Sequence, residues 1–161
     1  MSDTAEAPAR RAGRRDVVAA ARAWIGTPYR HQASAKGVGC DCLGLVRGVY
    51  AEIVGRVPEP PAYPKFAHDR RAREKALRDA LDGWCLPIWA LREFGPVSPA
   101  EGDVALVSLG GSRPATHLVI VERFDFAERR LRVIHAYSGH DVRSDLLPPG
   151  WRAVGFWCLP A

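Results

Sequence analysis

The residue best placed for chemistry in this chain is Cys42, which stands in the run GCDCLGL at residues 39–45. The apolar pattern after it predicts a helix that begins near Asp41 and ends at about Val54, so Cys42 lies in the first turn. Unpaired backbone N–H groups and the positive end of the helix dipole favour a thiolate there. A thiolate is a strong nucleophile, and the same N–H groups can hold an oxyanion. The run therefore predicts a nucleophilic cysteine.

A nucleophilic cysteine needs a base, and two of the five histidines lie in predicted strands. His117 belongs to the predicted strand 116–124, and His135 belongs to the predicted strand 131–137. If the two strands form a hairpin whose turn is centred on residue 127 or 128, both imidazoles lie on one face of the sheet. We expect that face to turn towards the helix that begins with Cys42. One histidine then accepts the thiol proton and the other orients the first.

Each of these residues also has a structural interpretation. A cysteine at a helix start is more often buried and inert, and a single histidine in a strand is more often a hydrogen-bonded core residue. A zinc site built from Cys40, Cys42 and a distant histidine is a poor match to the usual ligand spacing, so we expect no metal ion and no cofactor. Cys85 and Cys158 lie in apolar runs and are predicted to be buried free thiols.

The elements that position these residues fall into two halves. A helix over about 16–25, capped by Asp16, is predicted before the helix that carries Cys42. The second helix has a strip of small side chains that predicts a close neighbour; its members are Gly44, Gly48 and Ala51. Strands are predicted later in the chain, at residues 104–109, 116–124, 131–137 and 151–159. Helices followed by strands indicate the α+β class.

The chain is long enough for one domain, which we place at residues 15–161, after a flexible basic tail over 1–14. A Pro-rich connection and an exposed charged helix over 69–81 form an insertion over about 56–95. The insertion ends in an aromatic stretch, 84–94. We expect its large side chains in the core, with a docking face as the alternative; they are Trp84, Trp89 and Phe94.

Composition excludes several classes of protein. The 161 residues are 47% hydrophobic and 25% charged, which is a globular balance. No apolar run is long enough for a membrane span. Residues 1–15 contain no apolar stretch, so we expect no secretory signal and synthesis in the cytoplasm. The net charge of +5 comes without a nucleic-acid-binding motif, so we predict no nucleic-acid partner and assign the charge to an arginine-rich surface.

Five short motifs occur in an order that resembles the NlpC/p60 family of papain-like cysteine peptidases, over roughly 16–158. The first two are GTPYR at residues 26–30 and DCLGL at residues 41–45. The others are GDVA at residues 102–105, His117 at the start of a predicted strand, and VIHA at residues 133–136. Each motif is short, but the ordered set is specific.

The resemblance implies a papain-like α+β fold, with the nucleophile at a helix N-terminus packed on an antiparallel sheet. It implies that Cys42 is the nucleophile, His117 the general base and His135 the third, orienting residue. It further implies that Tyr29 lines the substrate site and that Asp41 meets the free amino end of the substrate, although Asp41 can also cap the helix. The implied substrate is a peptidoglycan stem peptide, cleaved between γ-D-glutamate and a diamino acid.

Two departures from the family pattern leave alternatives open. The family usually has Ser at the position of Leu43 and often has Gly at the position of Val119. We expect the larger Val119 side chain to narrow the site. These departures favour a structural tail-tip protein with a vestigial site as one alternative. A papain-like amidase or acyltransferase is another, since the same dyad serves several acyl reactions.

The lack of a recognisable export signal suggests how such an enzyme would reach a cell wall. A stand-alone, arginine-rich version resembles the tail-associated peptidases of phages and of phage-like gene transfer agents. The resemblance implies tail or baseplate proteins as partners. It also implies assembly into a phage-like particle that carries the enzyme to the recipient wall.

Overall fold

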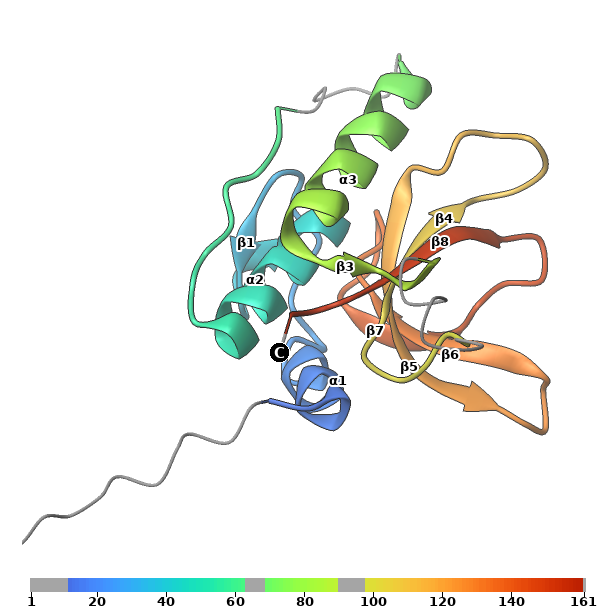
Figure 1. Ribbon diagram of the computed structural model, residues 1–161, viewed down its shortest axis with the longest axis horizontal. Helices are drawn as coiled ribbons and strands as arrows, with labels where there is room; N and C mark the ends of the chain where they lie inside the picture. The colour runs from blue at the N-terminus through green and yellow to red at the C-terminus, as the bar shows by residue number, and fades with distance from the viewer. Residues whose placement is uncertain (1–11, 63–68, 90–97, 161) are drawn as a thin grey trace, which may run out of the picture.

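The computed structural model describes residues 12–62, 69–89 and 98–160. Within these ranges, three helices lie beside a six-stranded antiparallel sheet (Figure 1). The helices are α1 (Arg14–Arg22), α2 (Cys42–Val54) and α3 (Arg70–Trp84). The strand order is β3-β8-β4-β5-β6-β7. The strand bounds are β3 (Leu86–Pro87), β4 (Val104–Ser108), β5 (His117–Asp125), β6 (Arg130–His135), β7 (Arg143–Leu146) and β8 (Arg152–Cys158). A two-stranded sheet, β1 (Ser34–Ala35) with β2 (Gly39–Cys40), precedes α2. The predicted α+β class is confirmed.

Helix α2 begins and ends as the sequence predicts. The Asp41 side chain accepts a hydrogen bond from the Gly44 backbone N–H at 2.7 Å and so caps the first turn. Gly55 ends the helix in the left-handed region, with φ of 81°, which glycine adopts without steric cost. Cys42 is therefore the first residue of a well-defined helix.

The small side chains along α2 have close neighbours, as predicted from the sequence. A Cβ atom added at Gly44 would lie 1.8 Å from the carbonyl oxygen of Ala33. One added at Gly48 would lie 2.0 Å from the indole ring of Trp24. Both distances are far inside van der Waals contact, so α2 packs closely against the segments on either side.

Helix α1 differs from its prediction at both ends. It begins at Arg14 and ends at Arg22, with Gly13 as the N-cap residue. Asp16 lies within the first turn, where its carboxylate accepts the Gly13 backbone N–H at 2.6 Å. Arg14 forms an ion pair with the buried Asp103, so it belongs to the packed domain and not to a tail. Of the predicted tail over 1–14, residues 1–11 lie outside the described residues.

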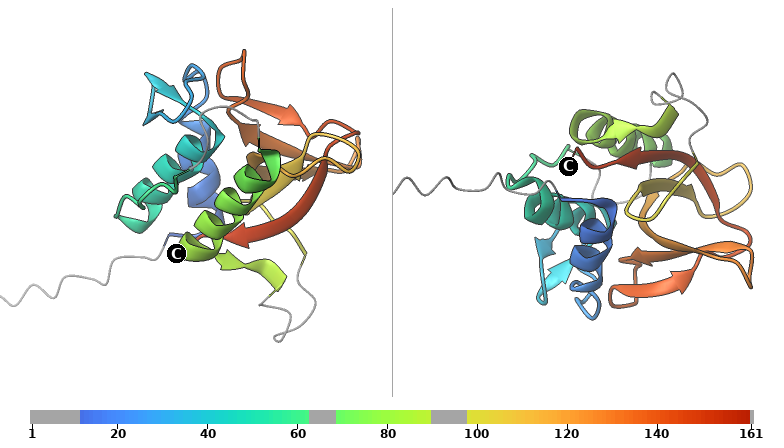
Figure 2. Two further views of the ribbon diagram at one scale, coloured as in Figure 1. Left: turned by 90° about the horizontal axis from the view of Figure 1, so that it is seen from above. Right: turned by 60° about the horizontal axis from the view of Figure 1, so that its bottom comes forward.

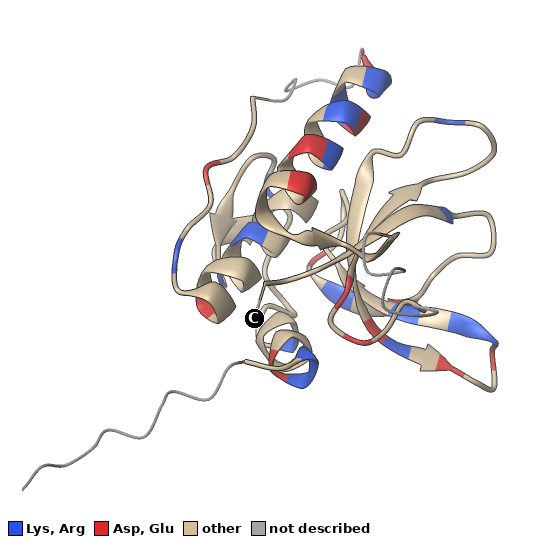
Figure 3. Ribbon diagram, in the orientation of Figure 1, with Lys and Arg blue, Asp and Glu red and all other residues tan. Residues whose placement is uncertain are grey.

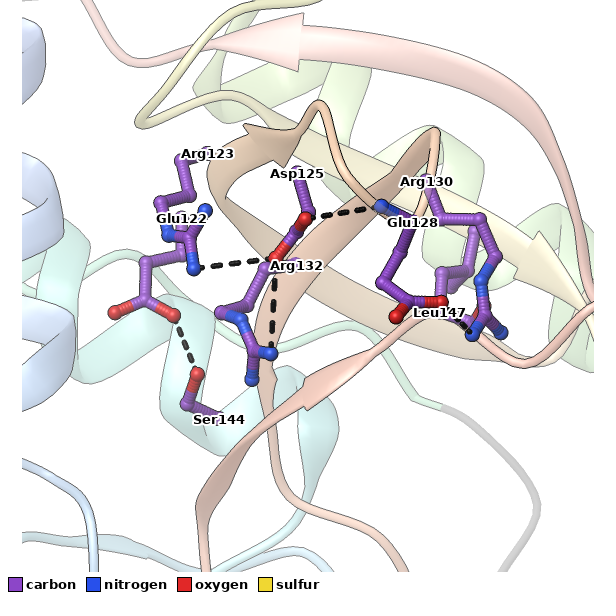
Figure 4. Close-up of polar contacts among 8 residues, drawn as sticks. All are labelled: Glu122, Arg123, Asp125, Glu128, Arg130, Arg132, Ser144 and Leu147. Carbon is purple, nitrogen blue, oxygen red and sulfur yellow. Dashed lines mark hydrogen bonds and ion pairs between the residues drawn. The ribbon is translucent and has the colours of Figure 1, made fainter.

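The β5–β6 hairpin has the register that the sequence predicts. Ile120 pairs with Ile134 and Val121 with Val133, which centres this part of the hairpin on residue 127. A bulge at Glu122 shifts the register by one residue between that point and the turn. Figure 4 shows the polar contacts that brace this outer part: Arg123 and Arg132 reach the Asp125 carboxylate at 3.2 and 3.8 Å, and the Ser144 hydroxyl donates to Glu122.

The two faces of the sheet contribute to two apolar clusters. Leu118 and Ile120 of β5 belong to the larger cluster, which includes the buried side chains of α1 and α2. Val119, from the same strand, belongs to a smaller cluster on the opposite face, together with Val133 and Trp151. This alternation follows from the two-residue period of a strand.

Helix α3 is longer and less exposed than predicted. It is capped by Asp69, and its inner face is buried at Leu77, Ala80 and Leu81. Figures 1 and 2 show it alongside β8, where the Trp157 indole N–H donates to Asp82 at 2.7 Å. Figure 3 shows that charged residues of both signs follow one another along α3.

The aromatic stretch after α3 is only partly a core segment. Trp84 packs against the main core, but the side chain of Trp89 is 68% exposed, so the expectation that Trp89 is buried is wrong. Phe94 lies outside the described residues. Cys85 is buried, whereas Cys158 is only half-buried, which corrects its prediction. None of the described helices has the length and apolar character needed to cross a bilayer.

Candidate active site

Cys42 and His117 line the same cleft, which has a volume of about 380 Å³. Cys42 comes from the first turn of α2, and His117 is the first residue of β5. The Cys42 side chain is almost completely buried. Its Sγ accepts a hydrogen bond from the Leu118 backbone and lies 4.0 Å from Nη2 of Arg73. The structure thus brings the predicted nucleophile and the predicted base to one cavity.

A chain of hydrogen bonds leads away from this cleft through three side chains. Nε2 of His117 lies 2.9 Å from Nδ1 of His135. Nε2 of His135 lies 2.9 Å from Oδ2 of Asp145 in β7. The two histidines are diagonal neighbours on β5 and β6, as the hairpin register requires. Asp145 was not predicted, because neither β7 nor its pairing with β6 was recognised in the sequence.

The acceptor at the end of this chain determines the tautomer of both imidazoles. The Asp145 carboxylate only accepts hydrogen bonds, so Nε2 of His135 carries a proton. Nδ1 of the neutral His135 ring then accepts, and Nε2 of His117 donates to it. Nδ1 of His117 is left without a proton. This nitrogen is therefore the one able to accept a proton from a thiol.

Two aromatic side chains hold the imidazoles in place. Trp151 contacts both rings edge-on, with centroid distances of 5.4 Å to His117 and 5.9 Å to His135. Tyr137 packs edge-on against His117 at 5.5 Å and is stacked on His135 at 6.2 Å. Packing on several sides limits ring rotation and excludes water from the hydrogen bonds.

The histidines lie on a different face of the sheet from the one expected. Alternation along β5 places His117 with Val119 and Trp151, on the face opposite α2. The expected face towards α2 is occupied by Leu118 and its apolar neighbours. Cys42 still shares the cleft because His117 stands at the end of the strand, next to the Leu118 backbone group that contacts Sγ.

Burial raises the pKa of the Cys42 thiol, and the neighbouring Asp41 carboxylate acts in the same direction. The Arg73 guanidinium and the Leu118 backbone hydrogen bond lower that pKa but are smaller causes. The pKa of His117 lies well below its ordinary value because of burial, with the charges of His135 and Arg73 adding to the effect. In the resting protein the thiol and the imidazole are therefore both neutral. The thiolate expected from the helix N-terminus is therefore not the resting form that these pKa directions favour.

His135 also has a lowered pKa, mainly because it is buried. The hydrogen bond and the charge of Asp145 act in the opposite direction. Asp145 is partly exposed, with 43% of its side-chain surface accessible, so solvent screens the effect of its charge on His135. His135 is therefore suited to transmit orientation between Asp145 and His117, as a neutral hydrogen-bonded ring.

Tyr29 lines the cleft next to Cys42, as its prediction requires. Burial raises the pKa of its phenol, and the proximity of Cys42 and Asp41 adds to the rise. Arg73 donates a hydrogen bond to the phenolic oxygen. The phenol thus remains protonated and faces the same space as the thiol. Its contact with a substrate stays a prediction.

Asp41 has a structural role that accounts for both of its oxygens. Oδ1 accepts the Gly44 N–H and Oδ2 accepts the Gln32 N–H, each at 2.7 Å. The side chain is 1% exposed and does not line the cleft. The helix-cap interpretation is confirmed. A contact between Asp41 and a substrate amino group stays a prediction.

The two departures from the family pattern lie away from the cleft. Leu43 is part of the main apolar core beneath α2. Val119 is part of the smaller cluster on the other face of the sheet. Neither residue lines the cavity that holds Cys42, so the narrowing expected at Val119 is not found.

Helix α3 supplies part of the site, which the sequence did not indicate. Nε of Arg73 donates to the Thr116 carbonyl at 3.2 Å, and the Glu74 carboxylate accepts the Ala115 N–H at 2.9 Å. Two consecutive residues of α3 thus hold the two residues before His117. Arg73 was missed because it stands in a run of alternating charges typical of a solvated helix face.

No three His, Cys, Asp or Glu side chains among the described residues are arranged to hold a metal ion. Cys40, the other cysteine of the run, is buried, and burial raises its pKa to about 12. Cys40 is therefore a neutral thiol in this structure.

The described site is a papain-like arrangement: a thiol at a helix N-terminus, opposite a histidine that opens a sheet strand. Comparison with known proteins gives the fold a name. The NlpC/p60 domain of the peptidoglycan hydrolase SagA is 22% identical, with a TM-score of 0.52; the alignment covers 84% of this chain and 90% of that one. An NLP/P60-family protein similar to a lipoprotein, from Staphylococcus aureus, is 19% identical with a TM-score of 0.53, over 98% of this chain and 45% of that one. Ly7917 is 14% identical with a TM-score of 0.54, over 92% of this chain and 63% of that one.

These likenesses lie in three-dimensional structure and not in overall sequence. No protein-family model matches the chain, and no curated protein matches its sequence. The structural matches cover most of this chain, and for two of them it spans less than two thirds of the matched chain. This chain has the NlpC/p60 fold, as the ordered motifs predicted.

Proposed function

We propose that this chain is a cysteine endopeptidase that hydrolyses peptidoglycan stem peptides, with Cys42 as its nucleophile. The observation that carries the proposal is the hydrogen-bonded chain from His117 through His135 to Asp145, which ends at the cleft that holds Cys42. The substrate class is supported by the fold, since one structure that shares it is a domain of a peptidoglycan hydrolase.

The proposed reaction begins when Sγ of Cys42 attacks the carbonyl carbon of the scissile amide. Nδ1 of His117 takes the thiol proton as the carbon–sulfur bond forms. The backbone N–H of Cys42 has no acceptor within the helix because it lies in the first turn, so it can donate to the developing oxyanion. The imidazolium then protonates the leaving amine, and the carbon–nitrogen bond breaks. A thioester to Cys42 remains.

The second half of the reaction returns the enzyme to its starting state. A water molecule attacks the thioester and gives a proton to Nδ1 of His117. The carbon–sulfur bond breaks, the acid is released, and Sγ recovers the proton. His135 and Asp145 hold the proton on Nε2 of His117 throughout, so that Nδ1 is the nitrogen that gains and loses a proton.

The bond that we propose is cleaved is the one between γ-D-glutamate and the diamino acid. This choice comes from the family resemblance, and Tyr29, which the resemblance places at the substrate site, lines the cleft with Cys42. Carriage on a phage-like tail is proposed from the sequence resemblance. Purified particles that contain this chain in a tail fraction would support it, and its absence from such particles would overturn it.

The test is a digest of purified peptidoglycan fragments under reducing conditions in water labelled with heavy oxygen. Mass spectrometry compares the wild-type chain with Cys42→Ala. We expect stem-peptide fragments from the wild type alone, with one heavy oxygen atom in each new carboxylate. Fragments without heavy oxygen, joined to an added amine, would identify an acyltransferase. No fragments, from a folded protein whose Cys42 can be alkylated, would favour the structural alternative.

A further inference from the structure

Three arginine side chains line the cleft that holds Cys42. Arg70 and Arg73 come from α3, and Arg113 comes from the loop between β4 and β5. No aspartate or glutamate is found among the described residues that line this cavity. The cleft lining thus carries three guanidinium groups and no carboxylate among the described residues, in a chain with a net charge of +5.

The innermost of these arginines is held in place. Nε of Arg73 donates to the Thr116 carbonyl, and Nη2 points towards Sγ of Cys42. Arg73 also donates to the Tyr29 phenol. These contacts fix the plane of the guanidinium across the cleft, between α3 and the start of β5.

The other two arginines surround the opening of the cleft. Arg70 precedes Arg73 by one helical turn and so lies on the same side of α3. Arg113 faces them from the β4–β5 loop, and both Arg70 and Arg113 are exposed to solvent. Figure 3 shows that α3 also carries acidic residues, but these have other partners: Glu74 accepts the Ala115 N–H, and Asp82 accepts the Trp157 indole N–H.

We propose that Arg70, Arg73 and Arg113 bind a carboxylate of the substrate beside the scissile bond. A guanidinium matches the two oxygens of a carboxylate, and several guanidinium groups at one point favour an anion over a neutral amide. This inference rests on the proposed function and adds a specificity to it. The chain would select stem peptides with a free carboxylate next to the cleaved bond.

Two carboxylates of a stem peptide lie near the scissile bond and could bind these arginines. One is the α-carboxylate of γ-linked D-glutamate, which is absent when that residue is D-isoglutamine. The other is the side-chain carboxylate of diaminopimelate, which is absent when the diamino acid is lysine. Four synthetic peptides that combine these two differences separate the sources.

The experiment measures kcat/KM for the four peptides with the wild type, the double variant Arg70→Gln/Arg113→Gln and the control Arg71→Gln. Arg71 is an exposed residue of the same helix that does not line the cleft with Cys42. We expect the wild type and the control to prefer one carboxylate form by about tenfold. The double variant should lose that preference. Equal rates on all four peptides, or a preference that persists in the double variant, would overturn the proposal.

A binding measurement separates this proposal from the proposed function. Calorimetry compares Cys42→Ala with Cys42→Ala/Arg70→Gln/Arg113→Gln on the same four peptides. Selective binding by the first protein alone supports the carboxylate site, even if the wild type cleaves nothing and the peptidase function fails. Cleavage without any carboxylate preference leaves the function standing and overturns the site. Absence of binding to every peptide overturns the site as well.

Discussion

Asp145→Ala tests whether the carboxylate at the end of the hydrogen-bonded chain supports the reaction. A hydrogen bond to a charged group contributes about 1.5–3 kcal/mol. The Asp145 side chain is 43% exposed, so solvent screening places its contribution near the lower end of that range. A loss of about 1.4 kcal/mol corresponds to about a tenfold fall in kcat. KM should change little, because Asp145 does not line the cleft.

The same reasoning predicts a larger effect one step closer to the thiol. His135 is 3% exposed and uses both ring nitrogens, so His135→Ala should cost about 3 kcal/mol, or about a hundredfold in kcat. The assay is steady-state cleavage of a synthetic stem peptide. Asp141→Ala, which removes an exposed carboxylate from the loop that leads into β7, is the control and should be neutral. Equal rates for Asp145→Ala and Asp141→Ala would refute the role of the carboxylate.

Three further predictions concern the base, the packing of α2 and its cap. His117 must be unprotonated to act, and its lowered pKa keeps the imidazole neutral in mild acid. In a profile of kcat/KM from about pH 4 to 9, the midpoint of the acid limb should therefore lie below pH 6.5, the ordinary pKa of histidine. A midpoint at or above pH 6.5 contradicts this. Gly48→Ala should lower the free energy of unfolding by about 1 kcal/mol in denaturant titrations, because overpacking against Trp24 exceeds the gain in helix propensity. Gly83→Ala, where a Cβ meets nothing within 4 Å, should raise it by about 0.5–1 kcal/mol, and the same sign for both would show the packing argument to be wrong. Asp41→Asn places an amide donor against one of the two backbone N–H groups that now share the carboxylate, and should lower the unfolding free energy by about 1–3 kcal/mol; unchanged thermal and denaturant unfolding would count against it.

The predictable part of the site follows from local rules. The capping aspartate and terminal glycine set the ends of α2, and hence the place of Cys42. The position of the β5–β6 turn and strand alternation placed His117 and His135 on one face, and their diagonal contact is confirmed. Both arguments need only the neighbouring residues in the chain.

The unpredicted part depends on contacts between segments far apart in the sequence. Asp145 reaches His135 only because β7 pairs with β6, and the short segment 143–146 has no alternating apolar pattern. Arg73 reaches Cys42 because α3 folds back over the start of β5. The face of the sheet was also misjudged, since the sequence pattern does not say which apolar set of β5 packs on the helices.

The most direct test of the central claim is to trap the thioester. The wild-type chain is mixed with a synthetic stem peptide, quenched in acid during turnover, digested and analysed by tandem mass spectrometry. The acyl part of the substrate should be found on Cys42 and on no other residue, and should be absent from Cys42→Ala treated in the same way. Peptide cleavage that continues in Cys42→Ala, or an acyl group attached to Cys40 or Cys85 instead, would contradict the account.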